Sequence, residues 1–240
     1  LNLRLFSRIA KRRSRMRARF RTCGAVAPLH PIFTACSGPT LTAIARVGSN
    51  AATFTRASTA YQIDFEAKHN LVLSGESRFQ GARRVANLVA TKSEDWTNAA
   101  WTKTIGTVTA TTLTSTGANQ TVLQTYTAAS SNWVMRVRMS RITGTGNIQL
   151  TLDGGTGWTT VTLTGSNQVF SIAQTGVTNP QFGIRIATSG DAINADQIAL
   201  YNTEGVTNTN PPEYVSVGVE SAPYHGANVD GVKYFSTLNG

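Results

Sequence analysis

The sequence has few charged residues, few cysteines and no long apolar run, and each shortage narrows the classes of protein to which it can belong. Charged residues make up 14% of the 240 residues. The two cysteines, Cys23 and Cys36, both lie near the N-terminus, so we expect no disulfide in the rest of the chain. No stretch of 18 apolar residues occurs, so we expect no membrane-spanning helix.

The sequence also lacks the motifs that mark common catalytic sites. It contains no phosphate-binding G-x-x-x-x-G-K, no G-x-S-x-G and no H-E-x-x-H. Cys23, His30 and Cys36 are too few and too widely spaced for a structural zinc site. We therefore expect no catalytic residues, no metal site, no cofactor and no enzymatic activity. One alternative stays open, a structural calcium ion held by Asp153, Asp191 and Asp196, which otherwise are turn residues.

Positive charge is concentrated at the N-terminus. Residues 1–21 contain no acidic residue, while the other 219 residues hold 13 basic and 12 acidic side chains. Such a block repels itself and needs an acidic partner. We expect it to act as an anchor through its basic residues, which are Arg4, Arg8, Lys11, Arg12, Arg13, Arg15, Arg17, Arg19 and Arg21.

The basic segment allows three interpretations. Leu5, Ile9, Met16 and Phe20 fit one side of a short helix that forms on docking. A disordered tail and an Arg-rich targeting peptide are the alternatives. Residues 22–50 contain several prolines and glycines and are predicted to be extended, so residues 1–50 form an extended anchor with a short basic helix.

The remainder of the chain has the pattern of an all-β protein. Eleven threonines fall between Thr102 and Thr127, and β-branched residues favour strands. Apolar and polar residues alternate around Trp133–Met139, Ile148–Leu152, Phe182–Ile186 and Ile198–Leu200, with turn residues every ~8–12 positions. We predict a jelly-roll β-sandwich over residues 91–205. A connector over 51–90 precedes it, and a C-terminal segment over 206–240, with a strand at 213–219, follows it and leads into further sequence.

The same alternation identifies side chains that point away from the core. We expect six of them to share one solvent-facing surface, which is a candidate face for a glycan or a partner, namely Trp158, Tyr201, Arg136, Arg138, Arg185 and Gln149. Trp96 and Trp101 lie in the loop before the body. The alternative is that the tryptophans belong to the core or to a docking surface, and that Arg136 and Arg138 only solvate a sheet.

Several segments resemble proteins of phage particles. They are ATFTRASTAY at 52–61, SRF at 77–79, RRVANL at 83–88, SEDWTNAAWTK at 93–103 and APYHGANVDGVKYF at 222–235. The pattern is similar to that of phage tail and virion structural proteins with a carbohydrate-binding-like jelly-roll module. Trp96 stands where these proteins usually have Phe, and the stretch between Tyr61 and Phe79 is shorter.

The resemblance implies a structural component of a phage virion, first of all a tail fibre or tail-associated protein. The alternatives are a capsid decoration or head-fibre protein and a glycan-binding module for host attachment. The implied partners are other virion proteins (tail, adaptor or nozzle, or capsid) and a host surface glycan. A homo-oligomer is expected, with a trimer as one option, and the implied location is the virion, assembled in the host bacterial cytoplasm.

Overall fold

The computed structural model describes residues 55–64, 66–206, 210–221, 224 and 227–235. The basic segment, its short helix and the extended segment over 22–50 lie outside the described residues. The described residues contain fourteen strands: β1 (Ala60–Ile63), β2 (His69–Val72), β3 (Arg83–Ala86), β4 (Thr102–Lys103), β5 (Thr107–Val108), β6 (Thr112–Thr114), β7 (Gln120–Thr125), β8 (Ser131–Thr143), β9 (Ile148–Thr151), β10 (Thr159–Val161), β11 (Gln168–Val177), β12 (Gln181–Ile186), β13 (Ala192–Asn202) and β14 (Val232–Phe235). Within this part of the chain, no helix is long and apolar enough to cross a membrane.

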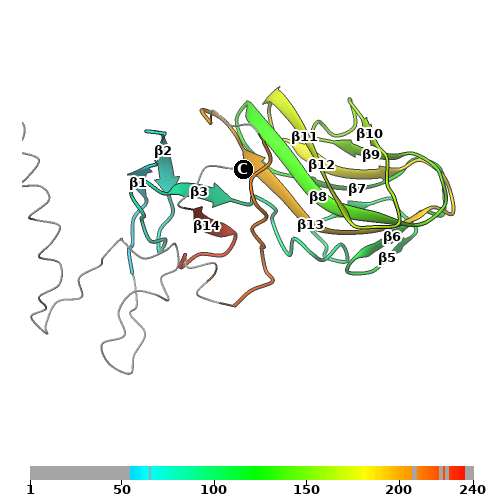
Figure 1. Cartoon of the computed structure of the whole chain (residues 1–240), viewed down its shortest axis with the longest axis horizontal. Helices are drawn as coiled ribbons and strands as arrows, with labels where there is room; N and C mark the ends of the chain where they lie inside the picture. The colour runs from blue at the N-terminus through cyan, green and yellow to red at the C-terminus, as the bar shows by residue number, and fades with distance from the viewer. Residues whose placement is uncertain (1–54, 65, 207–209, 222–223, 225–226, 236–240) are drawn as a thin grey trace, which may run out of the picture. The chain divides into compact units, whose positions relative to one another are not determined.

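Ten of these strands form two five-stranded antiparallel sheets, which lie in two layers (Figure 1). Sheet I has the order β10-β9-β12-β7-β4, and sheet II has the order β11-β8-β13-β6-β5. From β6 to β9 and from β10 to β13, consecutive strands alternate between the two sheets, which is the winding of a jelly roll. The expected all-β jelly-roll sandwich is confirmed.

The core lies between the sheets and follows the predicted alternation. On β8, Trp133, Met135, Val137 and Met139 are at most 1% exposed, whereas Arg136 and Arg138 point outward. The inward residues of β9, β12 and β13 are buried in the same cluster. Their packing against the opposite sheet is the main source of stability of this sandwich.

The two tryptophans of the 93–103 segment are core residues. Trp96 and Trp101 are 1% and 2% exposed, and their rings lie 4.6 Å apart. The Trp96 indole N–H donates to the carbonyl of Ala195 at 2.6 Å, and Trp101 packs edge-on against Phe182. The segment therefore closes one end of the core, and neither ring is available to a ligand.

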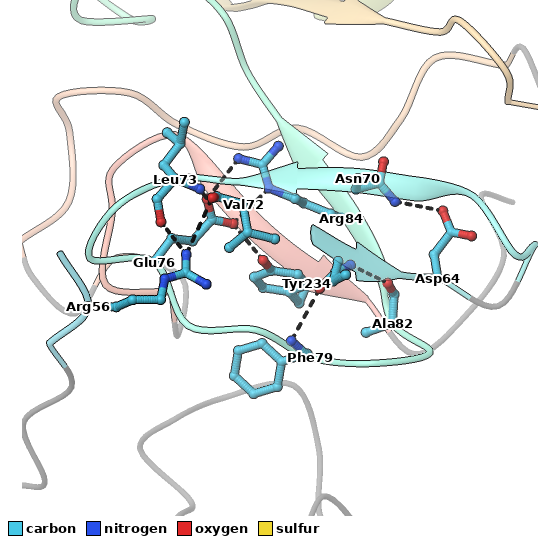
Figure 2. A network of polar contacts seen from close by, with 11 residues as sticks. Arg56, Asp64, Asn70, Val72, Leu73, Glu76, Phe79, Ala82, Arg84 and Tyr234 are labelled. Atoms are coloured by element: carbon cyan, nitrogen blue, oxygen red, sulfur yellow. Dashed lines mark hydrogen bonds and ion pairs between the residues drawn. The ribbon is translucent and has the colours of Figure 1, made fainter. Parts of the chain in front are cut away.

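The region expected to be a connector contains three strands. β1 and β2 form an antiparallel hairpin, and β3 pairs with β14, which joins residues about 150 positions apart. Figure 2 shows the polar contacts that hold these strands together. At their centre is Glu76, which is fully buried and forms an ion pair with Arg84, with an Oε1–Nε distance of 2.7 Å. Tyr234 of β14 donates its hydroxyl to the same Oε1 at 2.5 Å.

Two further side chains brace the hairpin, and Figure 2 labels one of them, Asp64. Asp64 accepts a hydrogen bond from the Asn70 side chain at 2.9 Å and another from the backbone N–H of Lys68, so it fixes the turn between β1 and β2. Gln62 is fully buried, donates to the carbonyl of Ala82 at 3.0 Å and accepts from the N–H of Phe79. Buried polar groups are tolerated here because they have partners.

The predicted strand at 213–219 does not form. Two prolines precede it, and its backbone makes separate hydrogen bonds with side chains and with the N–H of Ser93 instead of a strand ladder. Asn87 donates to the carbonyl of Val215 at 2.8 Å, and the N–H of Val217 donates to the Ser93 hydroxyl at 2.9 Å. Val215 packs with Val85, Ala199 and Tyr201, so this segment covers part of the outer surface of sheet II.

Candidate functional site

The six residues expected on one surface lie on two different surfaces. Gln149 and Arg185 belong to β9 and β12 of sheet I, and Trp158 immediately precedes β10 of the same sheet. Arg136, Arg138 and Tyr201 belong to β8 and β13 of sheet II. All six point away from the core between the sheets, but the two sets face opposite sides of the sandwich. The expectation of one shared face is therefore corrected, because alternation fixes the side of a strand and not the sheet to which it belongs.

The sheet II set is already engaged within the chain. Tyr201 is only 2% exposed, and its hydroxyl donates to the carbonyl of Glu213 at 3.0 Å. The Arg136 guanidinium lies 5.6 Å from the Tyr214 ring. Arg138 forms a two-pronged ion pair with Asp196. The expectation that Tyr201 is solvent-facing is corrected, since the segment around Val215 covers it, and the polar groups of Tyr201 and Arg138 are bonded within the chain.

The sheet I set forms a connected and partly exposed group. The Arg185 guanidinium lies over the Trp158 ring at 4.2 Å from its centroid. Its Nε–H donates to Gln149 Oε1 at 2.7 Å, and Gln149 in turn donates from Nε2 to the Thr160 hydroxyl at 3.2 Å. The indole holds the guanidinium plane by a cation–π contact, while the amide fixes its rotation. Three neighbouring strands thus orient one arginine.

Further polar residues extend this surface, which we call the sheet I face. Register places Arg185 opposite both Gln149 and Thr121, and Gln181 opposite Thr125. Gln181 donates to the Thr125 hydroxyl at 3.2 Å. Threonines and glutamines therefore cover most of the sheet I face. Alternation did not single out Thr160, Thr125 or Gln181. Each of the three lies an even number of residues from an outward residue of its own segment (Trp158, Leu123 and Arg185), and this spacing was the available signal. Only strand pairing, however, places the three on one face.

Arg185 is the charged residue of the sheet I face. In the part of the chain that the structure describes, its side chain forms no ion pair, and its hydrogen-bond partner is Gln149. Lys103, on the edge strand β4, uses its ammonium on the carbonyls of Trp96, Thr97 and Asn98. The Nη groups of Arg185 are therefore left to contact solvent or a ligand.

A hollow of about 250 Å³ adjoins this face at the edge of the sandwich. Its lining comes from β9, β11 and the 153–158 turn, and includes Asp153, Trp158 and Gln174. Burial alone would raise the pKa of Asp153, but hydrogen bonds from the N–H of Gly157 and from the Gln174 amide outweigh it and lower this pKa. The carboxylate is thus held by its own turn and by β11.

The three aspartates considered for calcium do not come together. Asp191 accepts from Arg141 and from the N–H of Gly146, and Asp196 pairs with Arg138, while Asp153 stays in its turn. Among the described residues, no three His, Cys, Asp or Glu side chains are grouped to hold a metal ion. Each of the three is instead part of a local hydrogen-bond arrangement.

Comparisons with known proteins found matches among solved structures. No protein-family model matches the sequence, and no curated protein is similar to it. Among solved structures, the chain is similar to the CBM22-1 xylan-binding domain of Xyn10C from Paenibacillus barcinonensis, with 10% identity over 51% of this chain and 97% of that one, and a TM-score of 0.38.

Two other carbohydrate-binding modules give similar values. The CBM36-1 domain of a multidomain xylanase from the hindgut metagenome of Trinervitermes trinervoides shares 18% identity over 52% of this chain and 99% of that one, with a TM-score of 0.31. The C-terminal CBM6 of LamC from Zobellia galactanivorans shares 14% identity over 50% and 99%, with a TM-score of 0.29. Identities and scores this low assign no ligand to this chain, so the functional argument rests on the sheet I face itself.

Proposed function

We propose that the chain is a glycan-binding protein and that the sheet I face is its binding surface. The observation that carries the proposal is the Trp158–Arg185–Gln149 group, in which an indole and an amide hold a partly exposed guanidinium in one orientation. Holding the arginine in one orientation costs side-chain entropy when the chain folds. Its N–H donors are then already in place before a ligand binds.

The chemistry of the face suits a sugar. Sugars present hydroxyl groups that both donate and accept hydrogen bonds, and the threonine and glutamine side chains of the face do the same. The partly exposed Trp158 supplies apolar surface for a sugar ring next to them. Among the described residues, the sheet I face holds no pair of carboxylates. Hydrolysis of a glycosidic bond normally needs such a pair, so the proposal is binding without cleavage.

An array of immobilised glycans tests this proposal with the full chain. We expect selective binding, and we expect Trp158→Ala to weaken it by about tenfold or more, as loss of an aromatic anchor commonly does. Arg136→Gln is the matched control, because Arg136 also lies over an aromatic ring but on sheet II. It should bind like the unchanged protein.

Two results would contradict the proposal. One is a complete lack of glycan binding by a protein that melts cooperatively. The other is binding that Trp158→Ala leaves intact and Arg136→Gln abolishes, which would move the site to sheet II.

A structural role in a phage particle is the second candidate, and the sequence resemblance favours it. The resembling segments contribute to the framework of the fold: Trp96 and Trp101 fill the core, Asn87 ties β13 to residue 215, and β14 pairs with β3. A framework role of these segments is compatible with any position on a particle, and with glycan binding by the same chain.

Deletion of residues 1–21 tests the second candidate. If the basic segment anchors the chain to an acidic virion surface, the truncated protein stays folded but no longer enters particles, and the full chain detaches as salt rises above ~0.1 M. Normal incorporation of the truncated protein would rule out this segment as the anchor.

A further inference from the structure

We infer that the sheet I face selects glycans that carry carboxylate groups, such as uronic acids, and that Arg185 determines this selectivity. The inference rests on the proposed function and deepens it. It comes from the charge and the geometry of one guanidinium, so it can fail while glycan binding stands.

The first support is the free donor edge of Arg185. A guanidinium has five N–H donors in one plane. Only the Nε–H has a hydrogen-bond partner among the described residues, Gln149 Oε1 at 2.7 Å. The four Nη hydrogens remain, and in this planar arrangement they match the two oxygens of a carboxylate.

The second support is the preset orientation. The Arg185 guanidinium lies over the Trp158 ring, 4.2 Å from its centroid, and the Gln149–Thr160 hydrogen bond holds the amide that fixes Nε. Both contacts leave the charge uncompensated, because neither the indole nor the amide is anionic. By contrast, two other arginines of the sandwich, Arg138 and Arg141, form ion pairs with Asp196 and Asp191.

The third support is the neutral character of the surrounding face. The residues that flank Arg185 across the strands, Gln149 and Thr121, are uncharged, and so are Gln181 and Thr125 further along. A neutral sugar would use only the hydrogen-bonding capacity of Arg185. An acidic sugar would in addition neutralise a charge that is otherwise left to solvent, which favours it over its neutral analogue.

The test compares two ligands that share one sugar chain and differ in whether their carboxyl groups are ionised or methyl-esterified. They are a pentasaccharide of α-1,4-linked galacturonic acid and the same pentasaccharide with every carboxylate methyl-esterified. Binding of each to the full chain is measured by titration calorimetry, alongside an array of neutral, carboxylated and sulfated glycans. We expect carboxylated glycans to be enriched on the array and the free acid to bind about tenfold or more tightly than the ester, as hydrogen bonds to charged groups do.

Variants at position 185 test whether Arg185 causes the preference for the acid. Arg185→Gln should weaken binding of both ligands, and of the acid far more, so that the acid and the ester bind about equally. Arg185→Lys should keep a weaker, more salt-sensitive preference for the acid, because it keeps the charge but loses the fork. Arg136→Gln should keep the full preference. Thermal melts of all variants check that they fold. If Arg185→Gln does not fold, Arg185→Lys still tests the inference.

The outcomes separate the inference from the proposed function. Equal binding of acid and ester, an array restricted to neutral or sulfated glycans, or an acid preference that survives Arg185→Gln would each overturn the inference and leave glycan binding in place. Absence of binding to every glycan would overturn the proposed function itself.

Discussion

The buried carboxylate of Glu76 gives the most stringent test of how the strands outside the sandwich are held. Its Oε1 accepts from Arg84 Nε at 2.7 Å and from the Tyr234 hydroxyl at 2.5 Å, and its Oε2 accepts from Arg84 Nη2 and from the N–H of Leu73, both at 2.9 Å. Every partner is a donor, so the site requires a group that only accepts. Glu76→Gln places two amide hydrogens among these donors and removes the charge opposite Arg84.

The expected cost follows from the burial of the pair. The side chains of Arg84 and Glu76 are 13% and 0% exposed, so the guanidinium that remains has little access to water. Removing one partner of such a pair costs about 3–5 kcal/mol. Replacing both, as in Glu76→Leu with Arg84→Met, should cost clearly less than the sum of the two single changes, because no charge is left behind.

Hydrogen exchange measured by mass spectrometry resolves where the loss occurs. We expect protection of β1, β2, β3 and β14 to fall by a factor of about a hundred or more in Glu76→Gln. All four tryptophans lie between residues 96 and 158, so their fluorescence during urea unfolding follows the sandwich separately. Glu204→Gln, at an exposed residue, is the matched control and should change neither signal. Unchanged protection in Glu76→Gln would refute the reasoning, since the buried network would then contribute nothing.

Two further predictions concern the sandwich and the buried tyrosines. Ile184→Asp should prevent folding, because it places an unpaired charge in the core. Arg185→Ala should lower the stability measured in thermal melts by about 1 kcal/mol or less. The opposite ranking would mean that the faces of β12 are reversed. The pKa of Tyr201 is raised above its usual value of 10.0, chiefly by burial, so the folded protein keeps a proton that the unfolded protein loses near pH 10. The contribution of Tyr201 to the free energy of unfolding should thus be constant below about pH 9 and fall as the pH rises through 10, and Tyr201→Phe should make the fall in stability above pH 9 shallower. An unchanged slope in urea titrations at several alkaline pH values would speak against this origin.

Local pattern predicted much of the sandwich. Alternation placed Trp133, Met135 and Ile184 inward, and the structure buries all three. It also placed Tyr201 on the outer side of β13, which is the correct side, but Tyr201 is buried because Val215 covers it from a distant part of the chain. Alternation carries no information about such coverage, nor about the pairing of β3 with β14.

The candidate site shows the same limit of prediction from alternation. Trp158, Arg185 and Gln149 were identified from their outward positions, and they do contact one another. Arg136 and Arg138 have equally outward positions, yet they lie on the other sheet. Sheet membership is decided by long-range strand pairing, which no short stretch of sequence specifies.

The most direct test of the sheet I face as a binding surface uses the tryptophan indole N–H signals in a nitrogen-15 NMR spectrum of the full chain. The indole N–H groups of Trp96 and Trp133 donate to the carbonyls of Ala195 and Val177, and Trp101 is buried, which leaves Trp158 as the partly exposed ring. Trp158→Phe assigns its signal. Titration with the tightest-binding glycan should shift the Trp158 signal and leave the other three in place. Saturation of the protein with glycan while the Trp158 signal stays unchanged would contradict the account.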